Sequence, residues 1–271
     1  MTANFDLTNK TAIITGGAGL LGPEHAKAIL DCNGSVILTD IDKDKLKKIS
    51  SSFKKNHNNR IQYIQMDVSK EQSINKVIKS LNRKKIKIDI LINNAAIDTS
   101  LDQALLKNFE NFKLTQWKKE ISVGLTGVFL CTQKFGSMIS KNKEGGVILN
   151  IASDLSVIAP DQRIYMKKGV KKENQSKKPV TYSAIKHGII GLTKYTATYW
   201  ADKKIRCNAL SPGGIDNNFD KSFKNKIHKL VPLKRMAKSN EYQSAVQFLC
   251  SDASSYMTGH NLIMDGGRSI W

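Results

Sequence analysis

Short apolar runs alternate with longer amphipathic stretches along most of the 271-residue chain. The apolar runs have the length and composition of buried strands, and the amphipathic stretches, such as 42–55 and 70–83, have helical spacing. The predicted strands are Ala12 to Ile14, Ser35 to Asp40, Ile61 to Val68, Ile88 to Asn94 and Gly145 to Ser153. Strands separated by helices indicate βαβ units and a parallel sheet.

The length is large for one domain but within the range of α/β folds. No Pro/Gly/Ser-rich linker and no internal repeat divides the chain. We therefore predict a single domain over residues 1–271, a Rossmann-type doubly wound parallel sheet with helices on both faces. Right-handed crossovers place the carboxyl ends of the strands at one edge, where such sheets bind their ligands.

The formal net charge of +20 suggests nucleic acid as a partner. However, only six of the 43 basic residues are arginine, the usual base-reading residue, and the lysines are interspersed with acidic residues. We therefore predict a lysine-rich surface and no nucleic-acid partner.

The start of the chain has no apolar signal core, and no apolar run approaches 18 residues. Cys32, Cys131, Cys207 and Cys250 lie far apart without metal-ligand spacing. We expect a cytoplasmic protein with reduced, buried cysteines, no metal site and no membrane partner.

The stretch TGGAGLLG lies between the first predicted strand and a helical pattern. Glycines there let the backbone approach a pyrophosphate, and the helix N-terminus supplies N–H donors. Gly17, Gly19 and Gly22 give the spacing G-x-G-x-x-G. Gly16, Gly19 and Gly22 give G-x-x-G-x-x-G, and a third pattern, T-G-x-x-x-G-x-G, needs glycine where the chain has Leu20. We predict a dinucleotide site.

Asp40 ends the second predicted strand, 24 residues after Gly16. A carboxylate there can accept hydrogen bonds from the adenosine ribose and repel a 2′-phosphate. Ile41 follows, at the position that a phosphate-binding arginine would otherwise occupy, so NAD is predicted over NADP. Lys43 would weaken this selection if it folded back, and Asp40 is also suited to cap the following helix.

Tyr182 and Lys186 are four residues apart on one predicted helical stripe, after Ser153. An unperturbed tyrosine is a poor proton shuttle at neutral pH, because its pKa is near 10. A lysine ammonium one turn away favours the phenolate and lowers that pKa. Tyr182 can then exchange a hydroxyl proton with a substrate.

Tyr-x-x-x-Lys after Ser153, with TGGAGLLG, Asp67, NNAA, NALSPGG and the closing MTGHNLIMDGG, resembles the short-chain dehydrogenase/reductase family, in its compact single-domain group. The similarity runs from about Lys10 to Gly267, and six weak motifs in the right order are specific together. It implies an NAD(P)-dependent enzyme that acts on CH–OH groups and transfers hydride between nicotinamide and a secondary alcohol or ketone.

The resemblance also implies roles for individual residues. Ser153 would hold the substrate oxygen, Tyr182 would transfer the proton, and Lys186 would bind the nicotinamide ribose as well. The implied cofactor-binding residues are Gly16, Gly19, Leu21, Gly22, Asp40, Asp67, Val68, Asn94, Ala95, Ala96, Tyr182, Lys186, Pro212, Gly213 and Ile215.

Two positions depart from the family pattern. Leu20 replaces a glycine of the pyrophosphate loop. Gly124 replaces an asparagine that usually anchors a relay water, in the helical stretch around WKKEISVGLTGVFLCTQ. Either the proton relay is rerouted, through bulk water or Asp154, or close helix packing comes with slow or lost catalysis. We favour an active enzyme because Ser153, Tyr182 and Lys186 are all present.

Two segments concentrate positive charge near the expected substrate pocket. An insertion over about 155–178 and a lid over about 216–238 each carry a net charge of +5. A cleft ringed by one sign of charge attracts the opposite charge, so we predict an anionic sugar or sugar nucleotide as substrate. Asp154, Arg163 and Tyr165 are the candidate contacts; solvated loops are the alternative interpretation.

The same region resembles dehydrogenases of bacterial flagellin or surface-glycan modification, which points to the same substrate class. Two other functions stay open: a 3-oxoacyl carrier-protein reductase, whose acidic carrier suits a basic rim, and a nucleotide-binding sensor without turnover. The family also implies a homotetramer or homodimer.

Overall fold

The computed structural model describes residues 5–97 and 108–271. Its centre is a seven-stranded parallel sheet in the order β3-β2-β1-β4-β5-β6-β7. The strands are β1 (Thr11–Thr15), β2 (Ser35–Asp40), β3 (Ile61–Gln65), β4 (Ile90–Asn93), β5 (Gly146–Ile151), β6 (Ile205–Pro212) and β7 (Asn261–Met264). This confirms the predicted single-domain, Rossmann-like α/β fold.

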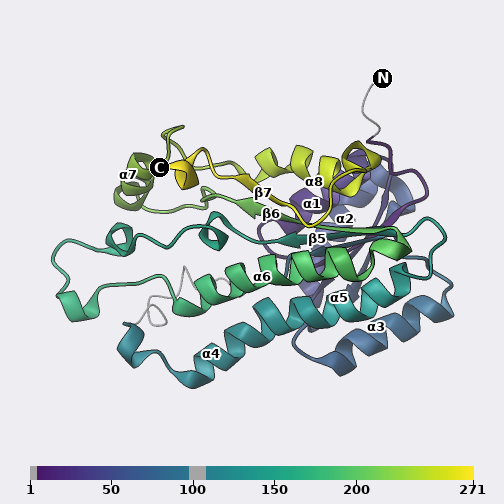
Figure 1. Ribbon diagram of the computed structural model, residues 1–271, viewed down its shortest axis with the longest axis horizontal. Helices are drawn as coiled ribbons and strands as arrows, with labels where there is room; N and C mark the ends of the chain where they lie inside the picture. The colour runs from purple at the N-terminus through teal and green to yellow at the C-terminus, as the bar shows by residue number, and fades with distance from the viewer. Residues whose placement is uncertain (1–4, 98–107) are drawn as a thin grey trace.

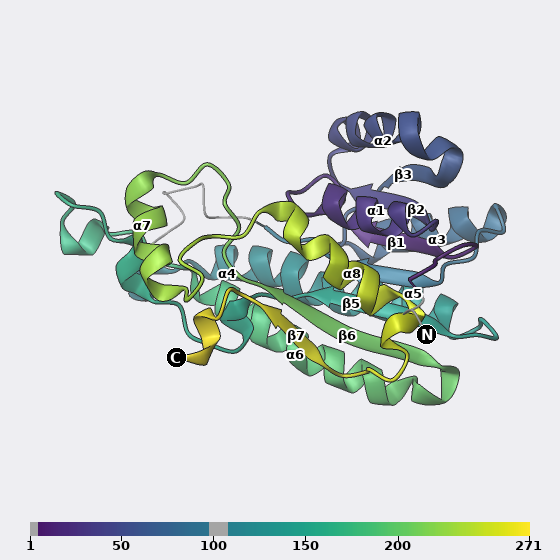
Figure 2. The same cartoon turned by 90° about the horizontal axis from the view of Figure 1, so that it is seen from above.

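Helices cover both faces of the sheet (Figures 1 and 2). One face packs against α1 (Gly22–Asp31), α2 (Lys43–His57) and α8 (Gln243–Cys250). The other packs against α3 (Glu71–Arg83), α5 (Gly127–Ile139) and α6 (Val180–Tyr199), and α4 (Leu114–Ile121) continues along α6. The strands carry apolar residues on both sides because both faces are covered.

The strand order reverses between β1 and β4, which leaves the ends of these strands side by side. The hydroxyl of Thr15 accepts hydrogen bonds from the backbone N–H groups of Asn94 and Ala95, at 3.0 and 3.1 Å. The loops after β1 and β4 are therefore tied together. In open α/β sheets this reversal point is the usual ligand-binding crevice.

The predicted long helix around Gly124 is continuous but not uniformly α-helical. A π-helical segment, Ser122–Thr126, joins α4 to α5. Gly124 is buried, and a Cβ there would lie 2.9 Å from two side-chain carbons of Ile185 on α6. Close packing against α6 thus explains why this position is a glycine. Single-turn π-helical segments such as this one often occur at functional sites.

The insertion and the lid pack against each other at one end of the molecule (Figure 1). Within the insertion, Gln162–Tyr165 forms a 3-10 turn, and the lid contains α7 (Lys221–Leu230). Their shared apolar cluster contains buried Ile164, Ile227, Val231 and Met236. The lid therefore packs against the insertion.

The four cysteines are all buried and unpaired, as predicted. Over residues 5–97 and 108–271, no helix is both long and apolar enough to cross a bilayer. The same residues hold no group of three or more His, Cys, Asp or Glu arranged for a metal ion.

Candidate functional site

The glycine loop is a cradle that side chains would fill. Gly16 has a φ of +63°, and a Cβ there would lie 2.7 Å from Ala95 Cα. A Cβ on Gly22 would lie 2.5 Å from the carbonyl oxygen of Gly17. Backbone alone fits at both positions, and α1 begins at Gly22, directly at the end of the loop. This arrangement suits a pyrophosphate.

Gly19 and Leu20 complete the loop without obstructing it. The Gly19 N–H donates to the Gly16 carbonyl at 3.1 Å, which closes the turn. The Leu20 side chain is 48% exposed, so the departure from the family glycine leaves the turn intact. Leu21 precedes α1 and is buried in the core beneath the loop.

Asp40 links the end of β2 to the glycine loop. Its carboxylate accepts hydrogen bonds from the N–H groups of Ala18, at 3.0 Å, and Asp42, at 3.1 Å. Asp42, rather than Asp40, caps α2, because its carboxylate accepts the Lys45 N–H at 3.0 Å. The alternative role of Asp40 as the helix cap is therefore wrong, and its carboxylate remains next to the loop.

The other predicted cofactor positions lie at the same edge of the sheet. The Asn94 side-chain amide donates to the carbonyls of Thr15 and Gly16. Although burial works against it, hydrogen bonds from Ser69 together with the ammonium of Lys70 hold the pKa of Asp67 below its usual value.

The remaining predicted cofactor positions lie at the same edge of the sheet. Val68 is buried beside α5, and Ala96 follows Asn94 and Ala95 in the loop after β4. Pro212 ends β6, and Gly213 passes so close to Asp265 that a Cβ would lie 2.7 Å from its Cα. Ile215 forms a bridge with Ala237 of the lid.

Lys186 lies beneath the end of β5. Its ammonium donates to the Ile151 carbonyl at 2.9 Å, two residues before Ser153, and the residue is 7% exposed. Burial lowers the pKa of Lys186 to about 8, and the neighbouring charge of Lys178 adds to this shift. Lys186 is thus still mostly protonated at neutral pH.

Two ammonium groups lie near the ring of Tyr182. Lys186 Nζ is 5.6 Å from the centre of its ring, and Lys178 Nζ is 3.8 Å from it. The residue before it, Thr181, is fully buried and donates to the buried carboxylate of Glu120 on α4. This contact fixes the start of α6. Two nearby cations favour the phenolate form of a tyrosine.

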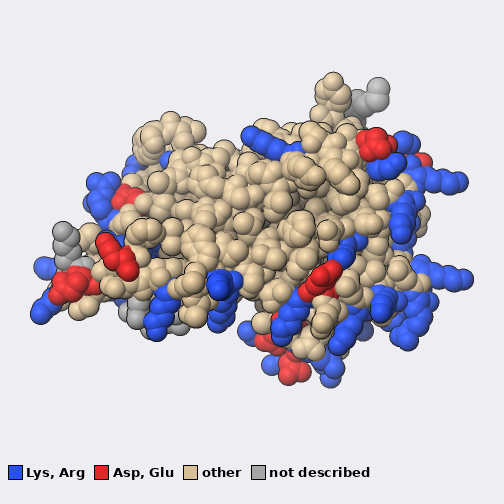
Figure 3. Space-filling view, turned by 60° about the horizontal axis from the view of Figure 1, so that its bottom comes forward, with Lys and Arg blue, Asp and Glu red and all other residues tan. Residues whose placement is uncertain are grey.

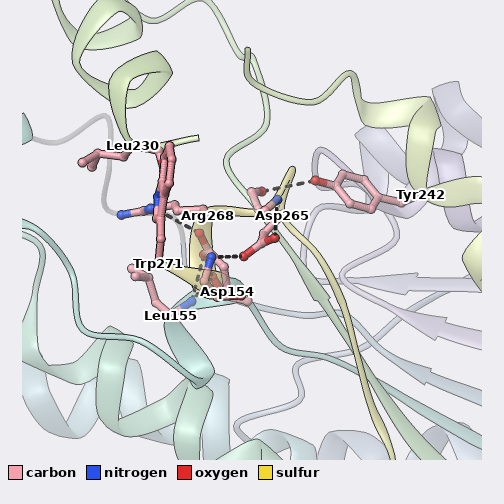
Figure 4. Close-up of polar contacts among 11 residues, drawn as sticks. Asp154, Leu155, Leu230, Tyr242, Asp265, Arg268 and Trp271 are labelled. Carbon is pink, nitrogen blue, oxygen red and sulfur yellow. Dashed lines mark hydrogen bonds and ion pairs between the residues drawn. The ribbon is translucent and has the colours of Figure 1, made fainter. Parts of the chain in front are cut away.

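Ser153 is also buried, and its hydroxyl is engaged by the next residue. Its Oγ donates to Asp154 Oδ1 at 2.8 Å. The second carboxylate oxygen of Asp154 accepts from Arg268 Nη1, also at 2.8 Å (Figure 4). Lys186 thus connects Tyr182 on α6 to the carboxyl end of β5, which Ser153 follows.

The three predicted substrate contacts have different surroundings. Asp154 is 3% exposed, and protein groups engage both of its oxygens. The Arg163 side chain is 84% exposed and pairs with Asp161 at 2.8 Å. Tyr165 is half-buried against Phe223, with ring centres 5.6 Å apart. The guanidinium of Arg163 therefore lies at the surface, bound within its own turn.

A cavity of about 690 Å³ lies at the start of α6, and Tyr182 is not itself one of its lining residues. Its lining includes Lys178 and Ser183, which flank Tyr182 in the chain, and the aromatic ring of Phe109. Lys177 adds a second ammonium, and Glu110 and Glu173 add two carboxylates. Positive and negative groups of the lining are therefore equal in number, and Lys178 is the lining cation that lies over the Tyr182 ring.

Sequence reasoning did not single out Lys178 and Arg268. Lys178 precedes Tyr182 by four residues, the same spacing that identified Lys186, but it lies before the helix starts at Val180. Arg268 is 114 residues from its partner, Asp154, so no local pattern connects them.

A dinucleotide cradle and a Ser–Tyr–Lys group at the same sheet edge define a nicotinamide-dependent oxidoreductase. A family model described as enoyl-(acyl carrier protein) reductase matches residues 18–269. An NAD-dependent glycerol dehydrogenase of Listeria innocua is 33% identical, over 98% of this chain and 96% of its own. A 3-oxoacyl-[acyl-carrier-protein] reductase of Buchnera aphidicola is 33% identical, over 97% and 98%.

Among solved structures, a short-chain dehydrogenase of Leptospira borgpetersenii with bound NAD+ is similar, with a TM-score of 0.83. It is 31% identical, and the match covers 99% of this chain and 96% of that one. The chain belongs to the short-chain dehydrogenase/reductase family. It is an oxidoreductase that acts on CH–OH groups with NAD or NADP.

Proposed function

We propose that this protein is an NAD-dependent dehydrogenase of an anionic sugar or sugar nucleotide. The observation that carries the proposal is the position of Lys178, which lines the cavity and stands 3.8 Å from the ring centre of Tyr182. A substrate with a carboxylate or phosphate on this ammonium would place a nearby hydroxyl at the tyrosine.

The nicotinamide, when bound, accepts or donates the hydride. Tyr182 takes the hydroxyl proton of the alcohol, or returns it to the ketone oxygen. Lys186 holds the tyrosine toward its phenolate form and binds the nicotinamide ribose. Ser153 holds the reacting oxygen of the substrate. General acid–base catalysis of this kind contributes typically about 10²- to 10⁴-fold.

The cofactor residues proposed are those predicted from the sequence. Gly16, Gly19, Leu21 and Gly22 form the pyrophosphate loop, and Asp40 receives the adenosine ribose. The loops after β3, β4 and β6 complete the site with Asp67, Val68, Asn94, Ala95, Ala96, Pro212, Gly213 and Ile215.

Asp40 should select NAD over NADP. Replacing it with asparagine keeps an oxygen for the Ala18 N–H but removes the charge that repels a 2′-phosphate. We expect the ratio of kcat/KM for NADP to that for NAD to rise about 10-fold, as expected for one lost charge–charge repulsion near the surface. Asp42→Asn, which removes a charge two residues away, should leave the ratio unchanged. An unaltered ratio in Asp40→Asn would contradict the assignment.

Lys178 should recognise the anionic group of the substrate. In Lys178→Met we expect KM for a carboxylate- or phosphate-bearing sugar to rise about 5- to 10-fold, a modest effect because the side chain is partly exposed. Lys168→Met removes the same charge from an exposed position in the insertion that does not line the cavity. An equal rise in KM in both variants would show that only the general charge of the loop matters.

A 3-oxoacyl carrier-protein reductase is the second candidate, favoured by the Buchnera relative and by the basic insertion and lid. Asp40 and the long insertion weigh against it. The names of the relatives above refer to glycerol and to an acyl carrier, and none refers to glycan modification. The substrate proposal therefore rests on the residues of this chain.

We also propose a homotetramer or homodimer, as is common in the family. Exposed Phe129 on α5, with Tyr195 and Tyr199 on α6, provides apolar surface on neighbouring helices. Figure 3 shows a broad area with few charged side chains across the middle of one face, with Lys and Arg at both ends and a mixed group of basic and acidic side chains below it. Such a surface suits contact with a second copy of the chain.

A further inference from the structure

The segment 265–271 brings a buried cation to the neighbour of Ser153 (Figure 4). The side chains of Arg268 and Asp154 are 8% and 4% exposed, and their Nη1–Oδ2 distance is 2.8 Å. A buried ion pair of this kind is weak evidence for stability, because well-packed apolar residues of similar volume often stabilise as much. The pair between Arg268 and Asp154 therefore suggests a role in positioning neighbouring side chains.

Asp154 connects Arg268 to Ser153, because its carboxylate contacts both side chains. Its Oδ1 accepts the Ser153 hydroxyl at 2.8 Å and the Leu155 N–H at 2.8 Å. The Leu155 N–H also approaches Ser153 Oγ at 3.2 Å. The Leu155 N–H holds Ser153 Oγ in place, so the hydroxyl can turn its proton from Asp154 Oδ1 to the reacting oxygen of the substrate, while Asp154 Oδ1 keeps the Leu155 N–H.

The turn that carries Arg268 is fixed by hydrogen bonds to Asp265. Both oxygens of the Asp265 carboxylate accept backbone N–H groups in the turn around Arg268, from Gly267 at 2.9 Å and Ser269 at 2.7 Å. Asp265 directly follows β7, so the turn is anchored to the sheet.

The same segment is attached to the lid. The Trp271 indole N–H donates to the Leu230 carbonyl at the end of α7, at 3.1 Å. The Leu233 N–H donates to the Gly266 carbonyl at 3.2 Å. One short segment thus contacts both the lid and the neighbour of the serine.

We propose that Arg268 is a positioning residue: through Asp154, it fixes the Ser153 side chain in the position from which its hydroxyl donates to the reacting oxygen of the substrate. This rests on the proposed role of Ser153. Small displacements of a group that positions the substrate can lower a rate by on the order of 100-fold.

The test replaces the buried pair with apolar residues, Asp154→Leu with Arg268→Leu, so that no unpaired charge is left in the interior. Thermal unfolding and NADH binding should stay close to those of the unaltered enzyme. With NAD+ and the best substrate among sugar acids and sugar phosphates, kcat should fall about 10- to 100-fold. Crystal structures of both proteins should show the Ser153 hydroxyl turned away from its original position.

A double-mutant cycle separates this inference from the proposed function. The loss caused by the apolar pair should disappear in a Ser153→Ala background, because the serine is the group through which Arg268 acts. If Ser153→Ala alone leaves kcat unchanged, the role of Ser153 in the proposed function fails. Two results would overturn only the role of Arg268. In the first, Ser153→Ala lowers kcat but the apolar pair does not. In the second, the apolar pair lowers kcat by the same factor whether or not the serine is present.

Arg268→Lys provides a second test should the apolar pair not fold. It keeps a cation near Asp154 but loses the planar guanidinium. We expect a smaller fall in kcat, with NADH affinity unchanged. An unchanged kcat and an unmoved Ser153 side chain in this variant would overturn the proposal.

Discussion

Replacing Tyr182 with phenylalanine should lower kcat by about two to four orders of magnitude while leaving the affinity for NADH nearly unchanged. The substitution removes the hydroxyl that exchanges the proton but retains the ring near Lys178 and Lys186. Lys186 keeps its hydrogen bond to the Ile151 carbonyl, so its contact with the nicotinamide ribose should persist. The measurements are steady-state kinetics and a fluorescence titration with NADH.

Tyr195→Phe is the matched control, because it removes the same hydroxyl from an exposed position on α6. Its kcat should equal that of the unaltered protein. If the Tyr182→Phe variant kept both its cofactor binding and its full function in the cell, catalysis would not be the role of the protein. The non-catalytic nucleotide sensor would then replace the proposed function.

Replacing Gly22 with alanine should abolish measurable dinucleotide binding. The new Cβ would lie 2.5 Å from the Gly17 carbonyl oxygen and 2.7 Å from that of Gly16. Both atoms belong to the backbone of the pyrophosphate loop, which cannot yield without losing its shape. We expect NADH affinity to fall at least about 100-fold, the effect of losing about 2.7 kcal/mol of binding free energy.

Gly191→Ala provides the control for the added methyl group. A Cβ at this exposed position of α6 has no heavy atom within 4 Å. Alanine should raise the free energy of unfolding by about 0.5–1 kcal/mol, because glycine is unfavourable inside a helix. NADH affinity should not change. Normal NADH binding by Gly22→Ala would contradict the placement of the cofactor.

The five strands β1 to β5 could be predicted from the sequence because their signals are local. Each is a short run rich in apolar residues, and a polar residue such as Asp40 or Asn94 marks its end. The strands β6 and β7, which lack so clear an apolar run, were not predicted. Because the strands are parallel, their carboxyl ends lie at one edge of the sheet. The spacing of Tyr182 and Lys186 is equally local, so their shared face followed from helix geometry.

The remaining features depend on contacts that local patterns do not encode. The sequence around Gly124 has an ordinary helical pattern, so it does not indicate the π-helical segment or the close approach of Ile185 from another helix. The charge of the insertion indicated Arg163 as a substrate contact. Asp161, two residues earlier, instead pairs with its guanidinium at the surface. The contact between Arg268 and Asp154 required the full tertiary structure.

The most direct test of the substrate proposal is a comparison of initial rates with NAD+ on two compounds that differ in one charged group, gluconate and sorbitol. A second pair, sorbitol 6-phosphate and sorbitol, tests phosphate in the same way. The account predicts a kcat/KM at least about 10-fold higher for the anionic member of a pair, and loss of that preference in Lys178→Met. Equal rates within both pairs, or turnover only of a 3-oxoacyl thioester with NADPH, would contradict it.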